Sequence, residues 1–133
     1  MPALPWRASE PVAPTASYVL TITRLPLRTH WRIPTMMRAT LRITRTLKRT
    51  DGLIGYSLKA DLIRKTFWTA SAWRDDAAVT RFVNSDTHRA ALDALQPHMG
   101  DARIETLTVT GSDLPPTWTD VEHRLMSRAA ART

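Results

Sequence analysis

The stretch Thr66–Leu95 constrains the fold most, because its residue pattern changes from strand-like to helix-like within a few positions. Its first eight residues are β-branched, aromatic or small, which suits a strand packed on both faces. After Arg74 the apolar residues recur at helical spacing, and Asp75 can accept hydrogen bonds from the first free N–H groups of a helix. We therefore predict a strand followed by a helix that runs to about Leu95, carries His88 and lines any pocket of this protein.

The rest of the chain supplies the elements that flank this unit. The predicted elements are, in order, the strand Ser17–Leu25, the helix Pro34–Thr50, the strands Leu53–Leu62 and Thr66–Trp73, the helix ending near Leu95, the strand Ala102–Thr110 and the helix Asp120–Ala131. This β-α-β-β-α-β order with an extra C-terminal helix is the ferredoxin-like arrangement, an α+β fold with two helices on one face of an antiparallel four-stranded sheet. We expect that domain over residues 17–110, between a flexible proline-rich tail (1–16) and a linker with the last helix (111–133).

Local signals add three expectations. Thr119 and Glu122 have the spacing of a capping box, which predicts the start of the last helix. Trp6 is either a loose residue of the N-terminal tail or an anchor on the domain. Simple alternation in the second strand places Ile54 on the same face as Tyr56.

The third strand has no charged residue on either face. Phe67 and Trp73 belong to one face and Trp68 to the other, with small or hydroxyl side chains between them. Two helices can cover only one face of the sheet, so the other face needs a different partner. A second subunit that packs sheet against sheet would cover it, and we therefore predict a homodimer.

The first predicted helix has one apolar stripe and one basic stripe. Its inward side carries Met36, Ile43 and Leu47, and its opposite side carries four arginines at spacings of four, three and four, namely Arg38, Arg42, Arg45 and Arg49. Such a stripe is either a solvated face or a binding surface for phosphate and other acidic groups.

Composition narrows the classes of site and partner. The 133 residues carry a net charge of +7, which favours acidic partners. We rank nucleic-acid binding last, because ferredoxin-like RNA binders use aromatics on the sheet face that we assign to the dimer. The chain has no cysteine, and its four histidines show no ligand spacing, so we expect no metal site and no cofactor. No apolar run reaches the length of a membrane span and the N-terminus lacks a secretory apolar core, so we expect a cytoplasmic protein without a membrane partner.

Three short segments resemble a known family. They are the turn Asp51–Tyr56, the strand end Thr69–Asp75 and the helical stretch Phe82–His88, which ends in Ser-x-x-His. With the order of elements, they resemble the antibiotic biosynthesis monooxygenase-like branch of the dimeric α/β-barrel superfamily over roughly residues 17–110. The resemblance implies a homodimer whose sheets form a barrel, with a pocket in each subunit between helices and sheet. The haem-degrading members need a Trp and a His where this chain has Phe82 and Leu92, so the chain is more similar to members without an assigned activity.

The resemblance implies a cofactor-independent monooxygenase-like activity on a small hydrophobic or aromatic metabolite. Such chemistry needs a base, a donor for a developing oxyanion and a dry apolar wall. His88 is the candidate catalytic base, since a neutral imidazole can accept a proton at neutral pH. The candidate substrate-binding residues are Tyr56, Arg28 and His30 as donors, with Trp68, Trp73 and Phe82 as apolar walls.

The alternative is a non-catalytic dimeric module that binds a ligand or an acidic partner through the basic helix face. An apolar pocket lined by Tyr56, His88 and tryptophans would favour the enzyme. A filled core with an exposed His88, beside a continuous arginine surface, would favour the binding module.

Overall fold

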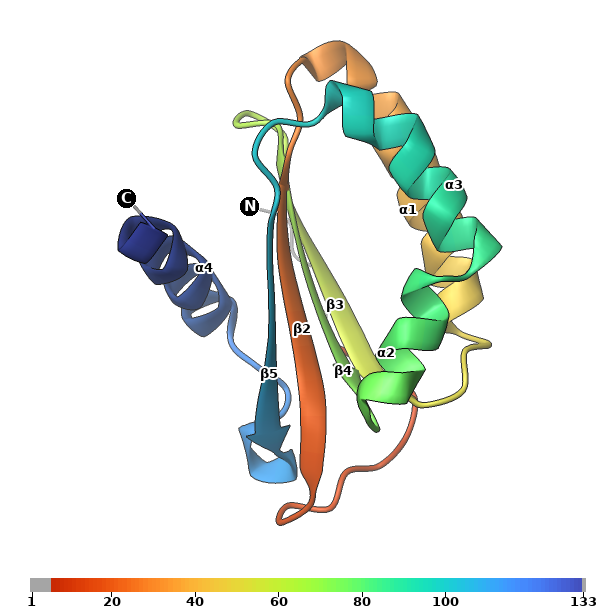
Figure 1. Cartoon of the computed structure of the whole chain (residues 1–133), viewed down its shortest axis with the longest axis vertical. Coiled ribbons are helices and arrows are strands. Elements are labelled where there is room, and N and C mark those ends of the chain that lie inside the picture. The colour runs from red at the N-terminus through yellow and green to blue at the C-terminus, as the bar shows by residue number, and fades with distance from the viewer. Residues whose placement is uncertain (1–5, 133) are drawn as a thin grey trace.

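A five-stranded antiparallel sheet forms the centre of the fold, with helices on both of its faces (Figure 1). The computed structural model describes residues 6–132, and the side chains of residues 6–125. The strands are β1 (Arg7–Ala8), β2 (Ser17–Pro26), β3 (Leu53–Asp61), β4 (Thr66–Trp73) and β5 (Arg103–Thr110), in the spatial order β1-β3-β4-β2-β5. The last four have the predicted ferredoxin-like order, and β1 adds an edge. The sheet is open and does not close into a barrel within this chain.

Two groups of helices lie on opposite faces of this sheet (Figure 1). One face lies beneath α1 (Ile33–Leu47), α2 (Asp76–Val83) and α3 (Asp86–Leu95), and we call it the helical face. The other, here called the back face, lies beneath α4 (Trp118–Arg132). Short 3₁₀ turns complete the chain at η1 (His30–Arg32), η2 (Gln96–His98) and η3 (Gly111–Asp113).

The single helix predicted after β4 is two helices, so that prediction is wrong in its middle. Asp75 caps the first as expected, its carboxylate accepting a hydrogen bond from the Ala78 N–H at 2.9 Å. The chain then leaves the helix at Asn84, and the Ser85 hydroxyl accepts from the His88 N–H at 3.3 Å as the cap of α3. Ser85 and His88 of the Ser-x-x-His motif are thus joined by a helix cap, because a serine hydroxyl satisfies a free N–H three residues on.

A β-bulge in β3 overturns the predicted face of Ile54. Leu53 pairs with Trp73 and Gly55 with Ala72, which leaves Ile54 as the extra residue. The side chain of Ile54 therefore packs on the back face, whereas Tyr56 packs on the helical face.

The N-terminal segment is attached to the sheet through Trp6 and β1, not free as a tail. β1 pairs antiparallel with β3, and Trp6 packs on the back-face core. The ring of Trp6 lies against Gly55, where a Cβ atom would stand only 2.5 Å from the ring. The absence of a side chain at Gly55 is what lets Trp6 act as an anchor. The tail predicted over residues 1–16 also includes residues 1–5, which lie outside the described residues.

The C-terminal helix begins two residues before the predicted start. The Thr117 hydroxyl accepts a hydrogen bond from the Asp120 N–H at 3.1 Å, so Thr117 and not Thr119 caps α4. Glu122 forms an ion pair with Lys59 of β3 in place of the predicted capping-box contact. This ion pair ties α4 to the sheet.

The back face is covered from within the chain. Val121 and Leu125 of α4 are 1% and 2% exposed, and they pack with Trp68 and its strand neighbours. Partly buried residues from both ends of the chain complete this core, including Trp6, Leu114 and Trp118. The uncharged back face of β4 therefore has an intramolecular partner, which the sequence prediction had assigned to a second subunit.

Candidate functional site

The helical face and its three helices enclose an apolar cavity of about 280 Å³. Its floor is formed by β2, β3 and β4, and its roof by inward residues of α1, α2 and α3. Four of the predicted site residues line it: Tyr56, Trp73, Phe82 and His88.

Three of these four residues form a continuous row of rings. The ring centroids of Trp73 and Phe82 are 5.2 Å apart, and those of Phe82 and His88 are also 5.2 Å apart in an edge-on arrangement. Trp73 comes from the end of β4, Phe82 from the last turn of α2 and His88 from the first turn of α3. The helix break at Ser85 therefore matters for the site, because it places a new helix start beside the aromatic pair.

His88 is half-buried, and its environment favours the neutral imidazole. Burial lowers the pKa of His88 from its ordinary value of 6.5, and the Val83 backbone raises it by a smaller amount. Its Nδ1 atom is buried without a hydrogen-bond partner. His88 thus lines the apolar cavity with a ring whose neutral form is favoured and whose buried Nδ1 is unused, and a neutral imidazole can act as a proton acceptor.

Sequence reasoning missed Thr21 as a site residue. Thr21 lies on β2, lines the cavity, and its hydroxyl oxygen is buried without a hydrogen-bond partner. The signal was available, since Thr21 and Thr23 alternate with apolar residues on the face of a strand that must lie beneath helices. A hydroxyl there is either unsatisfied or reserved for a ligand.

The Trp73 indole and Tyr56 are two further polar groups of the cavity wall that could donate a hydrogen bond to a ligand. The Trp73 indole N–H donates to the Ser71 hydroxyl at 2.8 Å, so the indole fixes the wall and does not offer a donor. Tyr56 is 4% exposed and lies in the same core cluster as Trp73. Of the three predicted donors, Tyr56 is the one at the cavity.

Trp68, Arg28 and His30 do not line the cavity. Trp68 is five residues from Trp73 on one strand, and an odd separation places the two side chains on opposite faces. It packs in the back-face core, with the guanidinium carbon of Arg24 5.7 Å from its ring centroid. Arg28 and His30 lie between β2 and α1, where Arg28 Nε donates to the Met99 carbonyl at 2.7 Å.

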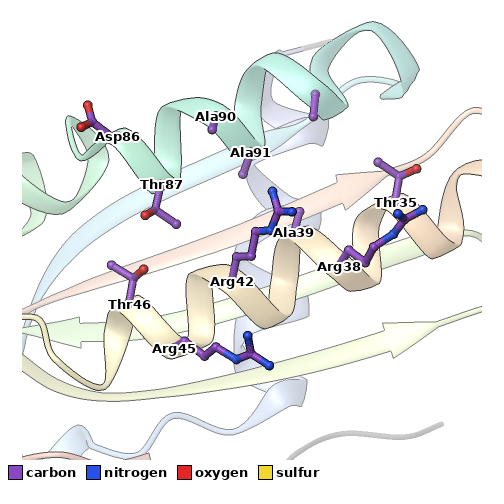
Figure 2. A pocket seen from close by; sticks show the side chains of 11 residues that line it. Thr35, Arg38, Ala39, Arg42, Arg45, Thr46, Asp86, Thr87, Ala90 and Ala91 are labelled. Carbon is purple, nitrogen blue, oxygen red and sulfur yellow. The ribbon is translucent and has the colours of Figure 1, made fainter.

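A second concavity is an open groove of about 640 Å³ between the outer sides of α1 and α3 (Figure 2). Arg38, Arg42 and Arg45 line it from α1, and Asp86 and Thr87 from α3. In Figure 2 Arg42 rises toward α3, whereas Arg45 points away from it. Among the described residues, none of these arginines forms an ion pair.

The described residues lack two further features. They contain no group of three or more histidines, aspartates or glutamates close enough together to hold a metal ion. They also contain no helix long and apolar enough to cross a membrane.

Comparison with known proteins places the fold. No protein-family model and no curated protein matches the chain, but solved structures do. An antibiotic biosynthesis monooxygenase superposes with a TM-score of 0.61 at 13% identity, covering 67% of this chain and 95% of that one. The chain has the ferredoxin-like fold of the antibiotic biosynthesis monooxygenase-like proteins.

Two further structures agree. A provisionally named antibiotic biosynthesis monooxygenase from Caulobacter crescentus CB15 has a TM-score of 0.61 at 18% identity, covering 68% of this chain and 88% of that one. A provisionally named monooxygenase from Lactobacillus acidophilus NCFM has a TM-score of 0.63 at 8% identity, covering 80% of this chain. This chain spans about half of that protein, 51%. At these identities the likeness concerns the fold, and the site must be argued from its own residues.

Proposed function

We propose that this chain is a monooxygenase-like enzyme that accepts a small hydrophobic or aromatic metabolite in the cavity of the helical face. The observation that carries the proposal is an apolar cavity lined by His88 and Thr21, whose buried Nδ1 and Oγ1 atoms have no hydrogen-bond partner within the described residues. Buried polar groups in native proteins nearly always have partners, so a ligand with its own polar groups is the natural one. At about 280 Å³ the cavity suits a compact ligand, close to the lower end of the roughly 300–1,000 Å³ common for ligand pockets.

The proposed chemistry uses a substrate that becomes a carbanion. Neutral His88 takes a proton from the acidic CH₂ group of an aromatic ketone, and Tyr56 and Thr21 donate hydrogen bonds to the enolate oxyanion that forms. Trp73 and Phe82 hold the ring and exclude water. The carbanion gives its electrons to O₂, so one oxygen atom becomes a new carbonyl at the former CH₂ carbon. The other oxygen leaves as water with the two hydrogens of that carbon.

Oxygen uptake tests this proposal. The purified protein is incubated with a tricyclic aromatic ketone that has an acidic CH₂ group, and oxygen consumption and product carbonyl are measured together. We expect consumption of one O₂ per carbonyl formed, and a loss of at least about tenfold in rate for His88→Gln. The matched control is His123→Gln on the exposed side of α4, which should keep the wild-type rate. Equal rates in wild type and His88→Gln would remove His88 as the base.

The alternative stays a binding module that uses the arginines of α1. The observation in its favour is the groove of Figure 2, in which Arg38, Arg42 and Arg45 have no acidic partner among the described residues. Saturable binding of an acidic ligand that is lost in Arg38→Gln/Arg42→Gln, together with no oxygen uptake by wild type, would favour this module.

A homodimer and a cytoplasmic location remain predictions. The position of α4 constrains the predicted homodimer, because α4 occupies the face of the sheet through which two sheets would pair. A barrel-type dimer therefore requires α4 to leave that face, and a dimer with α4 in place must form through another surface. The solution mass of wild type and of Leu125→Asp, which would detach α4, separates the two cases.

A further inference from the structure

Two large apolar side chains at one end of the molecule are almost fully exposed. Trp31 of η1 is 89% exposed, and Ile63 in the turn between β3 and β4 is 87% exposed. Among the described residues, the next most exposed large apolar side chain is Ile104 at 65%. Exposed apolar groups of this size that lie together commonly mark an interaction surface.

The segments that carry Trp31 and Ile63 are fastened to each other. The Leu27 N–H donates to the Lys65 carbonyl at 2.7 Å, and Lys65 Nζ donates to the Arg28 carbonyl at 3.3 Å. His30 Nε2 lies 3.3 Å from the Ile63 carbonyl oxygen. Two separate loops therefore present their apolar tips from one rigid end of the molecule.

Cations surround these tips. They are Arg28 and Arg32 in the first loop, with Arg64 and Lys65 in the second. The buried Asp61 accepts a hydrogen bond from the Arg64 N–H at 3.1 Å, and its Oδ2 lies 3.7 Å from Arg64 Nε, so Arg64 is partly compensated. The other three cations form no ion pair among the described residues. We call Trp31, Ile63 and these four cations the loop-end surface.

The sequence around the first loop strengthens this charge. No Asp or Glu occurs between Glu10 and Asp51, whereas Arg and Lys together occur eight times there. The basic stripe of α1 begins after this loop and runs along the helix, so the whole segment from η1 through α1 is basic.

We propose that the loop-end surface docks on an anionic lipid membrane without crossing it. Trp31 enters the interface between headgroups and acyl chains, which tryptophan prefers, and Ile63 enters beside it. The four cations then lie at the level of the lipid phosphates, where basic residues are attracted to anionic headgroups. This proposal departs from the expectation of no membrane partner, which rested on the lack of a spanning segment. A protein can lie on a membrane by short apolar tips and charge without spanning it.

Two other occupants fit the loop-end surface less well. A second copy in a two-fold dimer would place the same patch against itself and bring eight cations together. Nucleic acid would satisfy the cations, but its phosphates give exposed Ile63 no apolar environment. An anionic membrane satisfies both the cations and the apolar tips. This proposal does not depend on the cavity function.

Co-sedimentation with unilamellar vesicles tests the proposal. We expect binding to vesicles of phosphatidylcholine with phosphatidylserine, weak binding to phosphatidylcholine alone, and a decrease as salt is added. Trp31→Ser/Ile63→Ser should weaken binding at least about tenfold, because two apolar side chains lose their burial. Leu41→Ser, which removes a 55% exposed apolar group from the middle of α1, should bind like wild type.

Two double variants of equal net charge test whether binding depends on the loop-end surface or on the total charge of the protein. Arg32→Gln/Arg64→Gln should weaken binding, whereas Arg49→Gln/Arg89→Gln, with the same net charge, should have a smaller effect. Urea unfolding of each variant shows that the fold is kept, as expected for exposed positions.

Tryptophan emission gives a second readout. Trp31 is the one exposed tryptophan among the described residues, so anionic vesicles should shift its emission to shorter wavelength. Three results would overturn the proposal: no binding to anionic vesicles, full binding by Trp31→Ser/Ile63→Ser, or the same emission shift on raising the protein concentration without lipid. The last result would indicate self-association through this end.

Discussion

The two faces of one sheet differ in how well they are filled. On the back face, β4 presents Trp68, and α4 supplies Val121 and Leu125, so that large side chains close the space. On the helical face, the same strands present short hydroxyl side chains such as Thr21, Thr69 and Ser71 beneath α1 to α3. Helices resting on short side chains leave room that the roof residues do not fill, and a cavity of about 280 Å³ results.

The back face is packed as a stabilising core, whereas the helical face keeps features that suit ligand binding. The back face resembles an ordinary core, in which a residue matters for its volume. The helical face keeps unpartnered polar atoms and empty space, both of which cost stability and are retained where a ligand uses them.

Truncating the largest back-face side chain should have the largest effect on stability. Trp68→Ala removes a 9% exposed indole from the core, and we expect a loss of about 3–5 kcal/mol in the free energy of unfolding. Urea denaturation measures it. Ligand affinity at the cavity should be unchanged under folding conditions. A stable variant that no longer binds ligand would contradict the separation of the two faces.

Adding a side chain at Gly55, against the Trp6 ring, should lower the free energy of unfolding by a smaller amount. In Gly55→Ala the new Cβ would stand 2.5 Å from the Trp6 ring, and we expect a loss of about 1–3 kcal/mol from displacing that anchor. Gly100→Ala is the matched control, since its Cβ would meet its nearest neighbour at an ordinary 3.5 Å. Equal stability of the two variants in thermal or urea unfolding would show that Trp6 is not held by Gly55.

On the helical face, removing an unpartnered polar group should raise the free energy of unfolding. Thr21→Val replaces an unpartnered buried hydroxyl by a methyl group of similar shape, and we expect a gain of about 1 kcal/mol in unfolding free energy. The affinity for a polar aromatic ligand should fall in the same variant. A clear loss of stability would mean that the Thr21 hydroxyl has a partner in solution.

The smallest effect concerns pH. Burial lowers the pKa of His88 below 6.5, so the unfolded chain binds this proton more tightly than the folded chain. The contribution of neutral His88 to stability is therefore complete above about pH 6.5 and declines as the pH falls below that value. His88→Gln should flatten this part of the curve of unfolding free energy against pH. An unchanged curve would indicate that His88 titrates as an exposed histidine does.

Local pattern predicted much of the helical face. Alternation in β2 and β4 predicts which side chains share a face, and the strand leading into a helix carries the candidates Trp73, Phe82 and His88. Their row of ring contacts was not predicted. The pattern did not reveal that Ser85 starts a new helix, because a single capping serine competes weakly with continuous helical spacing.

The back face was less predictable because its contacts join distant parts of the chain. Trp6 meets Gly55 through space, and α4 meets β2 and β5 after a linker whose path no periodicity encodes. The predicted partner for that face was consequently a second subunit. Alternation places Trp68 and Trp73 on opposite faces of β4, so the prediction that both line one pocket was inconsistent with the pattern itself.

The most direct test of the account is a binding titration that compares a filled cavity with an intact one. Tryptophan fluorescence follows the binding of a hydroxylated naphthalene to wild type, to Thr69→Phe in the cavity wall, and to Thr119→Phe at an exposed position of α4 on the opposite face of the sheet. We predict saturable binding by wild type and Thr119→Phe, and affinity weakened at least about tenfold in Thr69→Phe. Equal affinity in all three proteins would contradict a ligand site on the helical face.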